Sequence, residues 1–361
     1  ASSIRVSSFA KSTSTGPGDH PTEAANVVLD EVHYGRCEIT LPRNDVGLRM
    51  EEEEKQKKSI SASSSAVVAA SAKNASAASD AASRKPVGEV ESARISEVAF
   101  LEGVSDQVRR SRQQDLLVFV HGFNVSFEAA VARTAQVALK IPFNGAVVSY
   151  CWPTQCGVFN YSDDEPINKA SVAPFTQFLF TLRQGVPPET RIHIMVHSMG
   201  NRIVMESLSN LSTQRGGSAS RSDASVSGTA LAAGTSPTRE PAASAVPLTR
   251  RRVEQDDVQK RKPFGHVVLC APDVGHDDFR KWAPGVVKQA ERVTLYANAG
   301  DSALIVSKSL HAEKRAGDAF VPLVVPGVDT IDCSPIEESL MGHSYYGDNR
   351  DVTTDLFMLI K

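Results

Sequence analysis

Short apolar runs alternate with amphipathic stretches over most of the chain after residue 113, and this alternation constrains the fold more than any other feature. Residues 114–121 (QDLLVFVH) are a continuous apolar run closed by Gly122, which is typical of a strand covered on both faces. Residues 127–140 then carry apolar residues at helical spacing. The same reasoning predicts strands at 146–152, 191–198, 266–273 and 292–298, and helices at 170–184, 201–211, 277–290, 301–311 and 351–360.

This order of elements predicts an α/β fold with a mostly parallel central sheet and helices on both faces. Residues 152–168 contain Pro153, Gly157 and Pro166 and are predicted to be a loop. Residues 321–334 are predicted to add further extended pieces. One α/β domain is therefore expected over residues 95–361, although the chain length alone suggests about two or three domains.

The remaining length lies in segments that lack such a pattern. Residues 1–26 are small and polar, and we expect them to be a disordered lead-in. Residues 27–50 carry β-branched and apolar residues, which predict an N-terminal β extension of two strands, joined by a turn at Tyr34-Gly35, that packs on the core. Residues 51–94 and about 212–262 are rich in Ser and Ala, so both are predicted to be disordered low-complexity insertions.

Charge and hydropathy exclude several classes of protein. The formal net charge of −3 gives no general electrostatic footprint for nucleic acid, and no such partner is expected. No run of about 18 apolar residues occurs, so no transmembrane segment is expected.

The cysteines and the first residues bear on location. The five cysteines have the spacing of neither a zinc site nor a dense disulfide framework. We interpret them as mostly buried, reduced thiols, which favours an intracellular (cytoplasmic) location. The chain begins ASSIRV, without Met or an apolar leader, so we expect a processed or shortened piece whose N-terminal address is missing.

Catalytic residues are expected just beyond the strands, because ligands of such sheets bind at the carboxyl ends of the strands. Ser198 lies between the strand 191–198 and the helix 201–211, with Gly200 two residues further on. A sharp strand-to-helix turn of this kind lifts a serine Oγ above the sheet and aims the N-terminus of the helix at the group bonded to it. A serine hydroxyl alone is a poor nucleophile and needs an imidazole oriented by a carboxylate.

Asp301 and His343 follow Ser198 along the chain, and both are predicted to stand just beyond strands. The order Ser, Asp, His is that of the α/β-hydrolases. It predicts Ser198 as nucleophile, His343 as base and Asp301 as the orienting acid, with Asp273 of Ala-Pro-Asp as the alternative acid. The alternative interpretation makes Ser198 and Asp301 helix caps and His343 an exposed loop residue.

Two backbone N–H groups are needed to hold the charge of a tetrahedral intermediate. Met199, directly after the nucleophile, is predicted to supply one. Phe123 in the turn after the first buried strand is predicted to supply the other, with Asn124 as substitute. Asn124 and Trp152 are substrate-pocket candidates, and Phe159 and Tyr161 in the same predicted loop as Trp152 are expected to line the acyl pocket as well.

Neither metal nor organic cofactor is expected. No Gly-rich phosphate loop of Walker or Rossmann spacing occurs in a suitable place, and no pair of histidines has convincing metal-ligand spacing. His121 and His197 are interpreted as structural residues that tie adjacent loops by hydrogen bonds.

Several motifs occur in a characteristic order. They are VFVHGFNVSFEAA, SYCWPT, MVHSMGNRIV, VVLCAPDV, RVTLYANAGDSAL and VPGVDTIDCS followed by LMGHSYYGDNR, preceded by YGRCEITLP. In these motifs the chain resembles the alpha/beta-hydrolase family once catalogued as a domain of unknown function, DUF900. The resemblance spans about 27–42 and 98–361 without the insertions. It implies an α/β-hydrolase fold and an esterase- or lipase-like triad at Ser198, Asp301 and His343.

One residue departs from the family pattern. Val196 stands two residues before the serine, where hydrolase elbows usually have Gly and this family often has Ala. Its extra methyl groups crowd a turn that needs close packing, so a less strained or slightly displaced elbow is expected.

The sequence therefore predicts a serine hydrolase that acts on a small-molecule or lipid carboxylic ester. Two alternatives remain. An acyltransferase would use the same triad with another acceptor. A catalytically inactive module of this fold would serve as a binding or scaffold domain, as Val196 and the charge-patterned insertions would suit.

Overall fold

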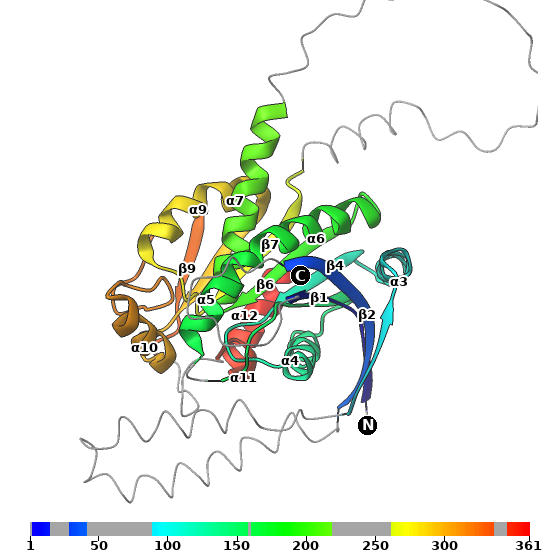
Figure 1. Cartoon of the computed structure of the whole chain (residues 1–361), viewed down its shortest axis with the longest axis horizontal. Coiled ribbons are helices and arrows are strands. Elements are labelled where there is room, and N and C mark those ends of the chain that lie inside the picture. Colours follow the sequence, from blue (N-terminus) through cyan, green and yellow to red (C-terminus); the bar gives the residue numbers. More distant parts are fainter. Residues whose placement is uncertain (1, 15–28, 42–88, 158–159, 219–260, 336–344) are drawn as a thin grey trace, which may run out of the picture.

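The computed structural model describes residues 2–14, 29–41, 89–157, 160–218, 261–335 and 345–361. Within these residues, nine strands form one sheet in the order β3-β2-β1-β5-β4-β6-β7-β8-β9 (Figure 1). The six strands from β5 to β9 in that order are all parallel to their neighbours. They are β4 (Asp115–Val120), β5 (Gly145–Cys151), β6 (Arg191–His197), β7 (Phe264–Cys270), β8 (Ala290–Ala297) and β9 (Val328–Asp332). The predicted mostly parallel α/β sheet is confirmed.

Helices cover both faces of this sheet. Figure 1 shows α6, α7 and α9 on one side and α4, α11 and α12 on the other. The helices are α3 (Glu97–Arg110), α4 (Phe127–Lys140), α5 (Tyr161–Ala170), α6 (Val172–Gly185), α7 (Gly200–Ser218), α9 (His276–Gln289), α10 (Ser302–His311), α11 (Tyr345–Asp348) and α12 (Arg350–Ile360).

The side chains of β4 show why its sequence is apolar throughout. Leu116, Val118 and Val120 enter the core cluster on one face of the sheet, and Leu117 and Phe119 enter the cluster on the other. Every residue of this strand is buried, because alternate side chains point into two different cores. A continuous apolar run is therefore what a central parallel strand requires.

Three strands extend the sheet beyond β5: β1 (Ser2–Ser14), β2 (Leu29–Leu41) and β3 (Glu89–Ile95). β1 is parallel to β5 and antiparallel to β2, which is antiparallel to β3. The expectation of a disordered lead-in is wrong for residues 2–14, and that of a low-complexity insertion is wrong for residues 89–94. These strands are formed by pairing with distant segments, which a local pattern does not reveal.

The expected turn at Tyr34-Gly35 is also wrong. Both residues lie inside the single strand β2, where Gly35 pairs with Phe9 on one side and Arg94 on the other. Two partner strands hold this glycine extended, which overrides its preference for turns.

Smaller differences occur elsewhere. The second half of the predicted loop 152–168 belongs to α5, which includes Pro166 and contacts α6 and α7. Only Val328–Asp332 of the expected extended pieces at 321–334 is a strand. Residues 15–28, 42–88 and 219–260, on which much of the predicted disorder falls, lie outside the described residues.

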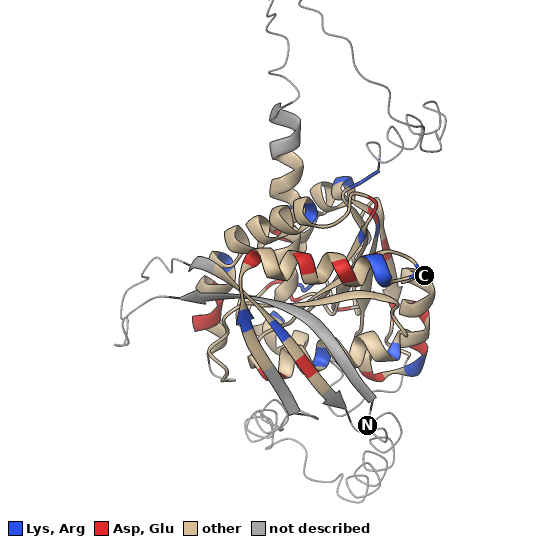
Figure 2. Ribbon diagram, turned by 90° about the vertical axis from the view of Figure 1, so that its right-hand side faces the viewer, with Lys and Arg blue, Asp and Glu red and all other residues tan. Residues whose placement is uncertain are grey.

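Two sequence-wide features have structural counterparts. In the described part of the chain, no helix is both long and apolar enough to span a membrane. All five cysteines lie among the described residues, and of these only Cys156 is exposed. Figure 2 shows Lys and Arg interspersed with Asp and Glu on the helices of the face it presents.

Candidate active site

Ser198 occupies a sharp turn between β6, which ends at His197, and α7, which begins at Gly200. Its φ is 52°, in the left-handed region that non-glycine residues seldom adopt. Neighbouring groups hold this conformation: the Ser198 N–H donates to the Cys270 carbonyl at 3.0 Å, and the Ser198 carbonyl accepts from the Asp273 N–H at 3.2 Å. The Asn201 side-chain amide donates to the same carbonyl at 2.8 Å.

Two glycines allow the turns after β4 and β6 to meet. A Cβ on Gly122 would lie 2.8 Å from the Cβ of Ser198. One on Gly200 would lie 3.2 Å from Val196 Cγ2 and closer still to the backbone at the end of β4. Val196 is fully buried, and Ser198 has its left-handed backbone with Val196 in place. The turn after β4 therefore lies directly against the serine elbow.

The His121 side chain supports the turn after β4. Its Nδ1 bonds to the Gly122 carbonyl at 2.8 Å, and its ring stacks on Trp152 at 5.5 Å between centroids. Trp152 Nε1 donates to the His121 carbonyl at 2.9 Å, and the indole is 2% exposed. Burial lowers the pKa of His121 to about 4, against the opposing effect of hydrogen bonds from its ring to the backbone of Gly122 and Trp152. Both rings therefore brace the turn that carries Phe123 and Asn124.

Asn124, the substitute oxyanion donor, also has a left-handed backbone, with φ of 56°. Its N–H donates to Thr154 Oγ1 at 3.2 Å. That hydroxyl in turn donates to the buried carboxylate of Asp164 at 2.5 Å. The Asn124 amide is thus committed to a hydrogen-bond chain within the protein.

Asp301 lies just beyond β8 and is 1% exposed. It is the N-cap of α10, where its Oδ1 accepts the N–H groups of Ala303 and Leu304, each at 3.1 Å. His343, the predicted base, lies outside the described residues.

The chain just after His343 returns to the same end of the sheet. The Tyr345 hydroxyl donates to the Tyr296 carbonyl of β8 at 2.8 Å. The ring of Tyr346 lies 4.7 Å from that of His197, the residue before the elbow serine. Both contacts are at the carboxyl end of the strands, where the sequence places the site.

Asp273, the alternative acid, is buried in the loop after β7 and bonded through both carboxylate oxygens. Ser307 Oγ donates to Oδ1 at 2.5 Å, and the Tyr161 hydroxyl donates to Oδ2. Arg202 Nη2 donates to Oδ2 at 3.2 Å, and Arg315 Nε lies 3.3 Å from Oδ1.

The parallel sheet and the serine turn between β6 and α7 fit the family to which the sequence matches. The sequence model of DUF900, described as an alpha/beta hydrolase of unknown function, matches residues 96–360. The chain belongs to the DUF900 family of α/β hydrolases. The family resemblance of the motifs is therefore confirmed. No curated protein matches the chain.

One solved structure with some likeness to this DUF900 protein is a monoclinic form of a Pyrobaculum calidifontis esterase. The two are 9% identical, with a TM-score of 0.34, and the likeness covers 68% of this chain and 76% of the esterase chain. The fold of the DUF900 chain accordingly rests on its own strand order and on the family match.

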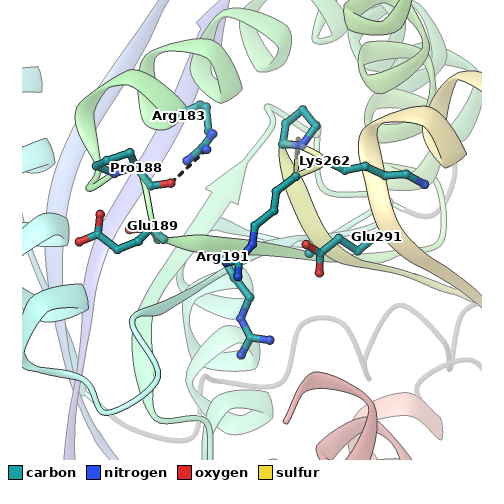
Figure 3. A pocket seen from close by; sticks show the side chains of 10 residues that line it. Arg183, Pro188, Glu189, Arg191, Lys262 and Glu291 are labelled. Carbon is teal, nitrogen blue, oxygen red and sulfur yellow. Dashed lines mark hydrogen bonds between the residues drawn. The ribbon is translucent and has the colours of Figure 1, made fainter. Parts of the chain in front are cut away.

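A small pocket lies at the opposite end of the sheet, around Arg191 at the start of β6 (Figure 3). Three of its cations have partners. Arg183 Nη2 donates to the Pro188 carbonyl at 3.2 Å, Arg191 Nε donates to Asp115 Oδ1 at 2.9 Å, and Lys262 Nζ donates to the Val287 carbonyl at 2.7 Å. Among the described residues of this DUF900 protein, no group of three or more His, Cys, Asp or Glu side chains could hold a metal.

Sequence reasoning missed two residues near the elbow, Arg202 and Ser307. Arg202 stands four residues after Ser198, in the first turn of α7. That spacing is the one signal that could have pointed to it. Ser307 is a polar residue on the buried face of α10, and its partner is 34 residues away.

Proposed function

We propose that this DUF900 protein is a serine hydrolase that cleaves carboxylic esters, with Ser198 as the nucleophile. The observation that carries the proposal is the left-handed φ of 52° at Ser198. A serine that merely caps a helix has an extended backbone, as Ser96 (φ −70°, ψ 158°) and Ser126 (φ −66°, ψ 163°) do at α3 and α4. The different backbone at Ser198 supports an elbow over a cap.

His343 is proposed as the base and Asp301 as the acid that orients it. Only Ser344 separates His343 from Tyr345, so the two Cα atoms are at most about 7 Å apart. Tyr345 is fixed on Tyr296 of β8, the strand that leads to Asp301. Asp273 is less suited to orient a histidine, because its carboxylate already accepts from Ser307, Tyr161 and Arg202.

The amides of Met199 and Phe123 are proposed as the oxyanion donors. Met199 directly precedes α7, so its N–H belongs to the positive end of the helix dipole. Phe123 is favoured over Asn124, since the Asn124 amide donates to Thr154.

The proposed reaction has two stages. His343 takes the proton of Ser198 Oγ as that oxygen attacks the acyl carbon, and the two amides hold the oxyanion that forms. The imidazolium, held by Asp301, then gives its proton to the departing alcohol. In the second stage His343 takes a proton from the water that attacks the acyl-serine, and gives it to Ser198 Oγ as the acid is released.

Labelling with a fluorophosphonate tests the nucleophile. The wild-type protein is expected to be labelled at Ser198, and Ser198→Ala to remove the label. His343→Ala is expected to slow labelling on the order of 10³-fold. Ser212→Ala, which alters a serine further along α7 that bonds only to the helix backbone, is the matched control and should label like wild type. An unlabelled wild type, or equal labelling of Ser198→Ala, would refute the proposal.

Asp301→Asn tests the acid. Asparagine caps helices about as well as aspartate, so α10 is expected to remain stable. Without the charge, the imidazolium is less stable and the imidazole less well oriented, so labelling should slow about 10³-fold or more. The pH dependence of labelling should also shift. Wild-type rates in Asp301→Asn would show that another residue is the acid.

A further inference from the structure

The carboxylate of Asp273 is the centre of a buried polar cluster. Ser307, Tyr161 and Arg202 donate hydrogen bonds to it, and the guanidinium of Arg315 lies beside it. We call these five residues the Asp273 cluster. Burial alone raises the pKa of Asp273, but Arg202 and Arg315 and the hydrogen bonds from Ser307 and Tyr161 lower it below its ordinary value. Asp273 is therefore an anion whose acceptor sites are occupied.

The cluster is bonded directly to the serine elbow. The Asp273 N–H donates to the Ser198 carbonyl at 3.2 Å. The Asp273 carbonyl in turn accepts from Arg202 Nε at 2.8 Å, and Arg202 lies in the first turn of α7, just after the elbow. The backbone of Asp273 alone is thus bonded both to the elbow and to α7.

The other partners come from the elements that carry the remaining proposed catalytic parts. Ser307 lies on α10, the helix capped by Asp301. Tyr161 is the first residue of α5, and its ring packs edge-on against that of Phe123, with the centroids 5.1 Å apart. Through Asp273, the elbow is therefore connected to the acid and to an oxyanion donor.

A second set of bonds joins the same three helices. Glu165 of α5 accepts from Arg202 of α7 at 2.7 Å, and His311 Nε2 of α10 lies 2.7 Å from the same carboxylate oxygen. At the Asp273 carboxylate, which is buried, such a network has few alternative arrangements, because breaking one bond leaves a charged or polar group unsatisfied.

We infer that the Asp273 cluster is a positioning device that sets Phe123 and Asp301 relative to Ser198. This inference rests on the proposed serine hydrolase function. Asp273, Tyr161 and Ser307 touch no reacting atom and act through the residues they hold. A displacement of about 1 Å at a catalytic group costs about 100-fold in rate. The loss of one hydrogen bond of the Asp273 cluster should therefore slow the chemical step strongly while the protein stays folded.

Tyr161→Phe and Ser307→Ala, made in the full chain, test this. Each removes a hydroxyl and keeps the rest of the side chain, so the ring of residue 161 still packs on Phe123. The fluorophosphonate labelling rate at Ser198 is expected to fall about 10-fold to 100-fold, with Tm changed by only a few degrees. Ser309→Ala is the matched control, since Ser309 is exposed on the same helix and bonds only to the Ile305 carbonyl. It should label like wild type.

A pair of substrates separates positioning from general destabilisation. p-Nitrophenyl butyrate is compared with its thionoester, whose C=S sulfur accepts weaker hydrogen bonds and so depends less on aligned donors. Tyr161→Phe is expected to lower kcat for the ester more than for the thionoester, with KM little changed. The apparent pKa of the rate profile should stay at its wild-type value, because His343 and Asp301 are untouched.

The outcomes distinguish the two proposals. A wild type that is not labelled at Ser198 refutes the hydrolase and this inference with it. A labelled wild type with unaffected Tyr161→Phe and Ser307→Ala refutes this inference alone. The inference is also refuted if kcat falls equally for the ester and the thionoester and Tm falls by a large amount, since the cluster would then only stabilise the fold. If the pH–rate profile shifts in Asp273→Asn but not in Asp301→Asn, Asp273 is the acid.

Discussion

The α-carbon of Gly200 lies against the carbonyl oxygen of His121, so close that a Cβ on Gly200 would stand 2.4 Å from that oxygen. Gly200 begins α7, and His121 follows β4. This contact presses the helix after the elbow serine onto the turn that carries Phe123. The contact therefore brings the carboxyl ends of β4 and β6 together at the proposed site.

Gly200→Ala is therefore expected to be strongly destabilising, because the methyl group meets backbone that cannot move aside. The free energy of unfolding in urea should fall by about 3 kcal/mol. Gly103→Ala is the control: it lies within α3, and the nearest atom to its added Cβ, on the Arg36 side chain, is 3.7 Å away. It should stabilise the protein by about 0.5 to 1 kcal/mol. Similar losses in both variants would contradict the close-approach argument.

Val196→Ala tests whether the departure from the family pattern impairs the elbow. Val196 is fully buried, so the variant should lose about 2 kcal/mol of unfolding free energy. Its fluorophosphonate labelling rate should remain within about 3-fold of wild type, because Ser198 is held by Cys270, Asp273 and Asn201 rather than by Val196. A rate increase well above that range would mean that the valine does strain the site.

Asp115→Asn should separate stability from activity. Arg191 contacts both oxygens of the buried Asp115 carboxylate at 2.9 Å, at the amino end of β4, far along the strand from the site. Burial raises the pKa of Asp115, but His193 and Arg191 lower it below its ordinary value. Removing the charge should cost about 3 kcal/mol in urea unfolding and leave the labelling rate of the folded protein unchanged.

The control for Asp115→Asn is Asp329→Asn. Asp329 pairs with Arg292 at 2.7 Å, but both side chains are at least half exposed. Such exposed pairs contribute about 0 to 1 kcal/mol. Equal losses in the two variants would show that burial does not set the strength of the first pair.

Stability should fall in mild acid through His121. An unfolded histidine binds a proton near pH 6.5, whereas the folded His121 has a pKa of about 4. Between these values the unfolded chain holds a proton that the folded protein does not, so stability decreases as the pH falls from 6.5, by about 3 kcal/mol at pH 4. Urea unfolding of His121→Gln at pH 7.5, 6 and 5 should show a shallower slope than wild type. Parallel slopes would refute this assignment.

The elements that the sequence predicts well are those whose patterns are local. The predicted helix 127–140 coincides with α4, and the predicted strand 114–121 differs from β4 by one residue at each end. In α4, burial against the core repeats at the helical period, and in β4 every residue is buried, so each pattern can be read from a short stretch of sequence. β1 and β3 were missed because their pairing partners are remote, and α5 because Pro166 suggested a loop.

Within the site the same division holds. The sequence by itself determined the family, the parallel α/β sheet and the serine between β6 and α7, because residue order and short-range periodicity encode them. Only the tertiary structure decided the surroundings of Asp273. Its bond to Tyr161 joins residues 112 positions apart in the sequence. The environment of a buried carboxylate depends on which donors the packed helices bring within about 3 Å, and no local pattern specifies those distances.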